Sequence, residues 1–126
     1  MNPLTIEWIS KADADLSTAK RELRARKCPN YDAVCFHSQQ CAEKLLKALL
    51  TEEGLAFPRT HDLLRLLENL IPGHPDLELL KDVCSDLTAF AVEFRYPGEN
   101  ATKAMACLAV KNCDLVREEL LKRLRP

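Results

Sequence analysis

YDAVCFHSQQCAEKLLKALL, residues 31–50, decides the fold of this chain, because it reads as one long helix with two different sides. At about 100° per residue, one side is continuous and apolar and comprises Val34, Cys41, Ala42, Leu45, Ala48 and Leu49. The opposite side carries a stripe of Phe36, Gln40, Glu43 and Lys47, with His37 and Lys44 beside it. The pattern predicts a core-forming helix with a second face suited to recognition.

Four more helices are expected around this one, separated by breaks at proline and glycine. The expected ranges are 3–27, 31–53, 61–70, 76 to the Pro97-Gly98 break, and 100–124. Core stripes at three- and four-residue steps comprise Ile6, Ile9, Ala12, Leu16, Ala19 and Leu23 in the first helix, and Leu80, Val83, Leu87, Phe90 and Phe94 in the fourth. No alternation of period two indicates a strand. We expect an all-α fold, an antiparallel up-and-down bundle of four long helices plus a short fifth helix, as a single domain over residues 1–126.

Residues at the expected helix ends support these ranges. Pro3 suits an opening turn, Asn30 and Thr60 are suited to cap the second and third helices, and Gly54 ends the second.

Composition favours a helical protein without membrane spans. The 126 residues are 47% hydrophobic and 29% charged, with only three glycines. The net charge of −1 disfavours a nucleic-acid binder driven by bulk charge, although a local basic patch is compatible with it. The N-terminal stretch has no apolar run typical of a signal peptide, and no window approaches the roughly 18 apolar residues of a membrane span. We therefore expect a cytoplasmic protein.

The six cysteines are expected to be reduced and mostly part of the core. Cys35 and Cys41 lie six residues apart on one expected helix, as do Cys107 and Cys113. Six residues rise by about 9 Å, which is beyond the reach of a disulfide. No Cys or His pair has zinc spacing, so no metal site is expected, although a redox or metal role for the cysteines remains the alternative.

The recognition face of residues 31–53 leaves alternatives open. Phe36 either lies under a neighbouring helix or loop, or contacts a second subunit or a ligand. His37, near Glu43 and Lys44, is either an acid–base group or a hydrogen-bonding residue at the core boundary. Gln39 and Gln40 suit amide recognition or hydrogen bonds between helices.

The sequence AVEFRYPGEN closes the fourth expected helix with a second candidate surface. Ser85, Ala89, Val92 and Tyr96 form a small-to-apolar stripe away from the core stripe, so this helix is sandwiched inside the bundle or across a dimer. The guanidinium of Arg95 suits a phosphate or a carboxylate, and the alternative is that it binds helix-end carbonyls or a neighbouring acid.

Other charged residues are weaker candidates. His61 opens the third helix beside a loop, while Asp62 is explained by the helix dipole. The basic groups Arg21, Arg24, Arg26 and Lys27, and Lys122, Arg123 and Arg125, both lie at helix C-termini, where the dipole favours cations. Binding of an RNA backbone is the alternative. No phosphate loop, nucleophile elbow or histidine pair with metal spacing is present, and no cofactor is expected.

Taken in order, several segments resemble the HEPN domain family. They are Ala12, Asp15, Leu16 and Ala19 in the first helix, the Tyr-Asp start followed by CFHSQQCAEKLLKALL, the run Thr60-His61-Asp62-Leu63-Leu64, and FRYP. The resemblance implies a helical bundle of four to five helices, usually a homodimer, similar to the substrate-binding partner of small nucleotidyltransferases in prokaryotes. It also implies nucleotide binding, and in other branches a metal-independent ribonuclease toxin of a toxin–antitoxin pair.

This chain departs from the ribonuclease branch, whose motif is an arginine followed by histidine within four to six residues. YPGENATKAM follows Arg95, and no histidine comes after it. We therefore expect a non-catalytic, cytoplasmic, nucleotide- or substrate-binding subunit that is dimeric and works with a separate nucleotidyltransferase. The alternatives are a ribonuclease-type toxin and a purely structural interaction protein.

The residues that match the family suggest one binding site and one interface. The ligand-binding candidates are His37, Gln40, Glu43, Lys44, His61, Arg95 and Tyr96. The interface candidates are Phe36, Ala89, Val92 and Tyr96. Within the site, Arg95 would contact a phosphate, and Phe36 or Tyr96 would stack on a base or lie in the dimer interface.

Overall fold

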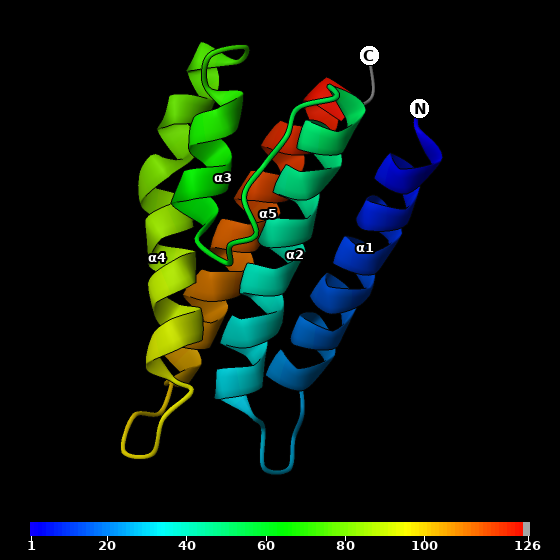
Figure 1. Cartoon of the computed structure of the whole chain (residues 1–126). Helices are drawn as coiled ribbons and strands as arrows, with labels where there is room; N and C mark the ends of the chain where they lie inside the picture. Colours follow the sequence, from blue (N-terminus) through cyan, green and yellow to red (C-terminus); the bar gives the residue numbers. More distant parts are fainter. Residues whose placement is uncertain (125–126) are drawn as a thin grey trace.

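The computed structural model describes residues 1–124 and is helical throughout its regular elements (Figure 1). The elements are α1 Pro3–Leu23, α2 Tyr31–Glu52, α3 Leu63–Leu70, the 3₁₀ helix η1 Pro75–Leu80, α4 Lys81–Glu93 and α5 Lys103–Leu124. Helices α1, α2, α4 and α5 alternate in direction, and the loop after α2 runs back along the bundle before α3 begins (Figure 1). The all-α, up-and-down bundle expected from the sequence is confirmed.

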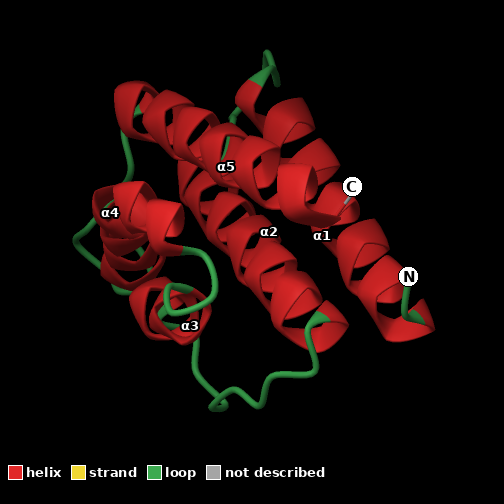
Figure 2. Ribbon diagram, turned by 90° about the horizontal axis from the view of Figure 1, so that it is seen from above, coloured by secondary structure: helices red, strands yellow, loops and turns green. Residues whose placement is uncertain are grey.

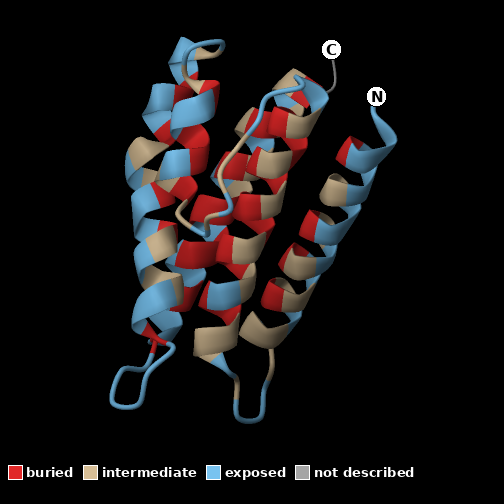
Figure 3. Cartoon of the chain, in the orientation of Figure 1, coloured by how far each residue is buried: buried red, intermediate tan, exposed pale blue. Residues whose placement is uncertain are grey.

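Helix α2 is the centre of the bundle, because it contacts α1, α3, α4 and α5 (Figure 2). All six residues of its predicted apolar side are buried. Its enclosure extends further, since Cys35, Ser38, Leu46 and Leu50 are buried as well. In Figure 3 the buried positions face inward on every helix, and those of α2 extend over most of its length.

The core stripes of the outer helices follow the predicted spacing with one clear error. Ala12, Leu16 and Ala19 of α1 are buried, but Ile6 is 55% exposed and the neighbouring Thr5 is buried instead. The reason is that α1 packs against α2 and α5 along one side only, so a shift of one residue turns a side chain from the core to solvent. In α4, Leu80, Leu87 and Phe94 are buried, while Val83 and Phe90 pack at the core edge.

Most helix ends lie within a few residues of their predicted positions. Asn30 caps α2 by accepting a hydrogen bond from the backbone N–H of Ala33 at 3.0 Å, as predicted. At α3 the predicted cap is wrong: Asp62, not Thr60, accepts from the N–H of Leu64. Gly54, just beyond α2, has a φ of 67°, which is the left-handed conformation that favours glycine.

Two helices end or begin away from the expected residues because the chain turns before the proline breaks. Helix α1 ends at Leu23 rather than residue 27, and the chain bends through Cys28, whose φ is 45°. Helix α4 follows the 3₁₀ turn of η1 and ends at Glu93, so Arg95 and Tyr96 lie beyond it.

The structure also bears on the predictions for the cysteines, the basic end of the last helix and membrane spans. Four cysteines are buried and free, whereas Cys28 and Cys107 are free and exposed. Lys122 and Arg123 occupy the last turn of α5, but Arg125 lies outside the described residues. Within residues 1–124, no helix combines the length and apolarity needed to cross a membrane.

The central position of α2 makes a stability prediction. Replacing the fully buried Leu45 with alanine leaves a cavity between α2 and its neighbours, and should lower the free energy of unfolding by about 2–5 kcal/mol. The matched variant Leu79→Ala, at a side chain that is 60% exposed, should change it by less than about 0.5 kcal/mol. Urea unfolding of both variants measures the difference, and equal losses would contradict the central role of α2.

Candidate functional site

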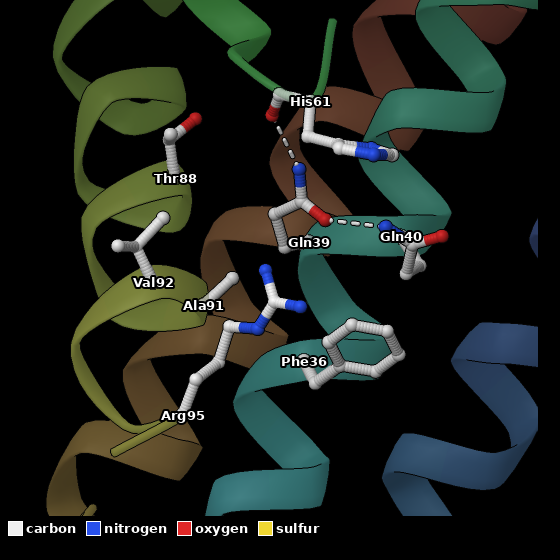
Figure 4. Close-up of a pocket in the computed structure, with 8 residues that line it drawn as sticks. All are labelled: Phe36, Gln39, Gln40, His61, Thr88, Ala91, Val92 and Arg95. Carbon is white, nitrogen blue, oxygen red and sulfur yellow. Dashed lines mark hydrogen bonds between the residues drawn. The ribbon is translucent and has the colours of Figure 1, made fainter.

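A groove of about 180 Å³ lies between α2 and α4 and is the main candidate site (Figure 4). Helix α2 forms one wall, and α4 together with Arg95, just after it, forms the other. The segment before α3 contributes His61. The lining residues are Phe36, Gln39, Gln40, His61, Thr88, Ala91, Val92 and Arg95. Three of the predicted ligand-binding residues, Gln40, His61 and Arg95, therefore meet in one groove.

The floor of the groove is a chain of two amides. Gln39 is 2% exposed, and its Nε2 donates to the backbone carbonyl of His61 at 2.8 Å. Its Oε1 accepts a hydrogen bond from Nε2 of Gln40, also at 2.8 Å. This connection ties α2 to the segment that precedes α3, and it places the Gln40 side chain at the rim of the groove (Figure 4).

Glu43 forms hydrogen bonds with Gln39 and His61 beneath the two amides. Although the sequence placed it on the polar side of the helix, it is only 4% exposed. Its carboxylate accepts from Lys47 at 2.9 Å, from Nδ1 of His61 at 2.9 Å and from Nε2 of Gln39 at 3.3 Å. Burial raises the pKa of Glu43, but the hydrogen bonds from Lys47, His61 and Gln39 outweigh burial and leave the pKa below its ordinary value. Glu43 is therefore an ionised, fully partnered buried group.

Arg95 supplies the positive charge of the groove. It follows the end of α4, where its backbone N–H donates to the carbonyl of Val92 at 3.3 Å. Figure 4 shows its guanidinium directed into the groove, toward the side chains of α2. Among residues 1–124 it forms no ion pair with a carboxylate. The guanidinium is thus available to an anion from solution.

Phe36 stands between this groove and a second hollow of about 260 Å³. The two hollows share Phe36, Ala91 and Arg95, and the second is closed by residues at the start of α2 and the end of α4. Phe36 is 40% exposed. Its ring meets the His37 ring edge-on, with 5.3 Å between the centroids. The aromatic ring and the Arg95 cation therefore face both hollows.

Three predicted ligand-binding residues lie elsewhere. His37 and Lys44 both bind Asp15 of α1, His37 through Nδ1 at 2.8 Å. This ion-pair cluster joins α1 to α2 on the side of α2 away from the groove lining. Tyr96 is 67% exposed and does not line the groove.

The predicted interface stripe is exposed along α4 and the segment that follows it. Ser85, Ala89, Val92 and Tyr96 are all exposed, and only Val92 also lines the groove. Phe36, the remaining interface candidate, belongs to the groove wall.

Sequence reasoning missed two parts of the site. Thr88 and Ala91 line the groove with Val92 and Arg95, and the spacing 88, 91, 92, 95 is one face of a helix. That spacing was a usable signal. The anchoring of Gln39 by the His61 carbonyl had no signal in the sequence, because it depends on where the loop crosses α2.

Metal binding has no geometric support in the described part of the chain. No group of three His, Cys, Asp or Glu side chains in residues 1–124 is arranged to hold a metal ion.

The ionised state of Glu43 makes a prediction on acid stability. Its pKa is lower in the native state than its ordinary value of 4.5, so the carboxylate stabilises the fold above that pH and loses this contribution as the pH falls through the native pKa. Glu43→Gln should lower the free energy of unfolding by roughly 1–3 kcal/mol at pH 7. The difference from wild type should shrink as the pH falls below 4.5, which chemical unfolding at several pH values measures.

The control for this measurement is Glu118→Gln, at an exposed position on α5. It should change stability little at any pH. A Glu43→Gln difference that stays constant down to pH 3 would show that the carboxylate charge does not stabilise the fold.

Comparison with known proteins places this geometry in a family. The family model described as the HEPN domain matches residues 5–124. Two crystal structures have the same fold: TT1696 from Thermus thermophilus has a TM-score of 0.79 with 24% identity, covering 94% of this chain and 96% of that one. ST0689, described as an archaeal HEPN homologue, has a TM-score of 0.77 with 23% identity, covering 99% of this chain and 100% of that one.

A curated relative matches over a shorter region. The Methanocaldococcus jannaschii protein named "Putative toxin MJ1304" is 41% identical over 64 residues, which is 51% of this chain and 40% of the relative. The chain thus spans less than half the length of that relative. The family match over residues 5–124, together with the bundle it predicts, confirms the resemblance found in the sequence: this chain belongs to the HEPN domain family.

Proposed function

We propose that this HEPN protein is a non-catalytic helical subunit that binds a nucleotide or a related phosphate-bearing substrate in the groove between α2 and α4. The observation that carries the proposal is Arg95, whose guanidinium points into the groove without an ion pair among residues 1–124. Among residues 1–124, no other lysine or arginine lines the groove, and its other polar groups are amides, a hydroxyl and an imidazole.

The groove chemistry fits the two ends of a nucleotide. A guanidinium binds phosphate through parallel N–H donors, and an exposed aromatic ring offers a stacking surface to a base. Arg95 and Phe36 both line the two adjoining hollows. A ligand with its phosphate on Arg95 therefore has space for its base on either side of Phe36.

The proposed assembly has two further parts. A homodimer would cover the exposed stripe of Ala89 and Val92 on α4 and Tyr96 just beyond it. A separate small nucleotidyltransferase would act on the bound ligand, as the family resemblance implies.

A ribonuclease-type toxin is the second candidate. Two observations favour it: the name of the M. jannaschii relative, and the meeting of His61 and Arg95 on one groove. His61 comes to this groove from another segment of the chain, so the usual order of arginine followed by histidine is not needed to bring the two side chains together. Of the three histidines, His37 and His74 do not line this groove.

Loss of the cation tests the first proposal. Arg95→Ala should weaken binding of nucleoside 5′-monophosphates roughly tenfold to a hundredfold, because hydrogen bonds to charged groups contribute about 1.5–3 kcal/mol. Isothermal titration calorimetry on the purified wild type and variant measures this. Arg65→Ala, at an exposed position on α3, removes the same charge away from the groove and should leave binding unchanged. Equal binding by wild type and Arg95→Ala would refute the proposed site.

Assays of RNA cleavage separate the two candidates. We expect the purified chain to leave single-stranded RNA intact and its expression alone to permit growth. Growth arrest with RNA cleavage, lost in both Arg95→Ala and His61→Ala but kept in His37→Ala, would establish the ribonuclease function instead.

A further inference from the structure

The hydrogen bonds around Glu43, taken together, fix which group donates and which accepts in each of them. Lys47 only donates, so its bond to Oε2 requires an acceptor there. At the other oxygen, Oε1, the ionised carboxylate also only accepts. Nδ1 of His61, 2.9 Å away, must therefore carry a proton. A neutral His61 then has its lone pair on Nε2.

The same reasoning fixes the two amides. Nε2 of Gln39 faces two acceptors, the carboxylate of Glu43 and the carbonyl of His61. The reverse orientation would place the Gln39 oxygen against both of these oxygens. Its Oε1 must therefore face Gln40, and Gln40 must present its NH₂ group in return. Figure 4 shows the Gln40 carbonyl oxygen on the side away from Gln39.

Two acceptors result at the rim of the groove. They are Nε2 of His61 and Oε1 of Gln40, and neither has a partner within the described chain. The His61 side chain is 79% exposed, so its free nitrogen is accessible to a ligand. The donor fork of Arg95 lines the same groove from the α4 side, and in Figure 4 the Gln40 oxygen and the His61 ring lie on the far side of Gln39 from it. The groove is therefore polarised, with a cationic donor on the α4 side and neutral acceptors on the α2 side.

We infer that Glu43 is a positioning residue that sets this polarity, and that the groove selects phosphate-bearing ligands whose other end donates hydrogen bonds. This inference rests on the proposed function, because it concerns ligands held by Arg95. The donors would be the hydroxyls of a ribose or the amino group of a base. Glu43 touches no ligand; it acts through His61 and through Gln39.

Substitution of Glu43 by glutamine should move the proton of a neutral His61 from Nδ1 to Nε2. Lys47 still requires an acceptor, so the glutamine oxygen turns toward Lys47 and its NH₂ turns toward His61. Gln39 then loses its 3.3 Å bond to position 43 and keeps the shorter bond to the His61 carbonyl. Nδ1 must then accept, and the proton moves to Nε2. The rim of the groove loses an acceptor and gains a donor, while the shape of the side chain at position 43 is almost unchanged.

The first test reads the tautomer directly and needs no ligand. Long-range ¹H–¹⁵N NMR at pH 8, where imidazoles are mostly neutral, should show the proton on Nδ1 of His61 in the wild-type protein. It should show the proton on Nε2 in Glu43→Gln and no change in Glu118→Gln. A wild-type His61 protonated on Nε2 would overturn the inference, and this outcome stands even if the variant does not fold.

The second test compares two probes that share a phosphate and an aromatic ring. Adenosine 5′-monophosphate carries donors, whereas phenyl phosphate carries none on its ring. At pH 8, Glu43→Gln should weaken the nucleotide roughly fivefold to tenfold, the effect of one or two neutral hydrogen bonds, and change phenyl phosphate less than about twofold. Equal weakening of both probes would overturn the selectivity.

The two proposals fail in different ways. If neither probe binds the wild-type protein, the proposed function is refuted along with the selectivity, while the tautomer still decides whether Glu43 positions His61. If both probes bind through Arg95 but the tautomer and the ratio of affinities do not respond to Glu43→Gln, the proposed function stands and the role of Glu43 is refuted.

Discussion

The structure depends on the enclosure of α2 by four other helices. A helix packed on one side needs a single apolar stripe, but α2 meets α1, α3, α4 and α5, so its core covers most of its circumference. Any polar residue in the middle of α2 must then be covered by a neighbour or partnered within the protein. Gln39 and Glu43, both buried, meet this constraint through hydrogen bonds, whereas the buried hydroxyl of Ser38 has no hydrogen-bond partner among residues 1–124.

The candidate site arises where that constraint meets the loop before α3. The loop runs back along α2, and its residue His61 offers both a backbone carbonyl and an imidazole to the buried polar side chains of α2. Burial strengthens these contacts and excludes alternatives. A network that first satisfies buried groups thereby fixes the side chains at the groove rim. The structural role of this face of α2 and the recognition role that we propose for it both rest on one set of hydrogen bonds.

Much of the fold was predictable because helix formation is governed by local periodicity. The apolar side of residues 31–50, the cap at Asn30 and the turn at Gly54 agree with the structure. The errors in the prediction occur at positions where contacts with neighbouring helices determine burial or the end of a helix. Ile6 and Thr5 differ by one position on α1, and only the contact with α2 selects which of them is buried. Arg95 and Tyr96 were placed on a helix that ends two residues before Arg95.

The sequence by itself determined the number of helices, their approximate ends, the apolar side of α2 and the membership of the HEPN family, because each of these depends on residue type and short-range spacing. Only the tertiary structure decided which polar residues share a site. His37 and Lys44 resemble Gln40 in their position on one helix, yet they bind Asp15 of α1 while Gln40 joins His61 and Arg95 at the groove. The path of the loop after α2 and the packing of α1 and α4 made that division, and both depend on contacts between residues far apart in the chain.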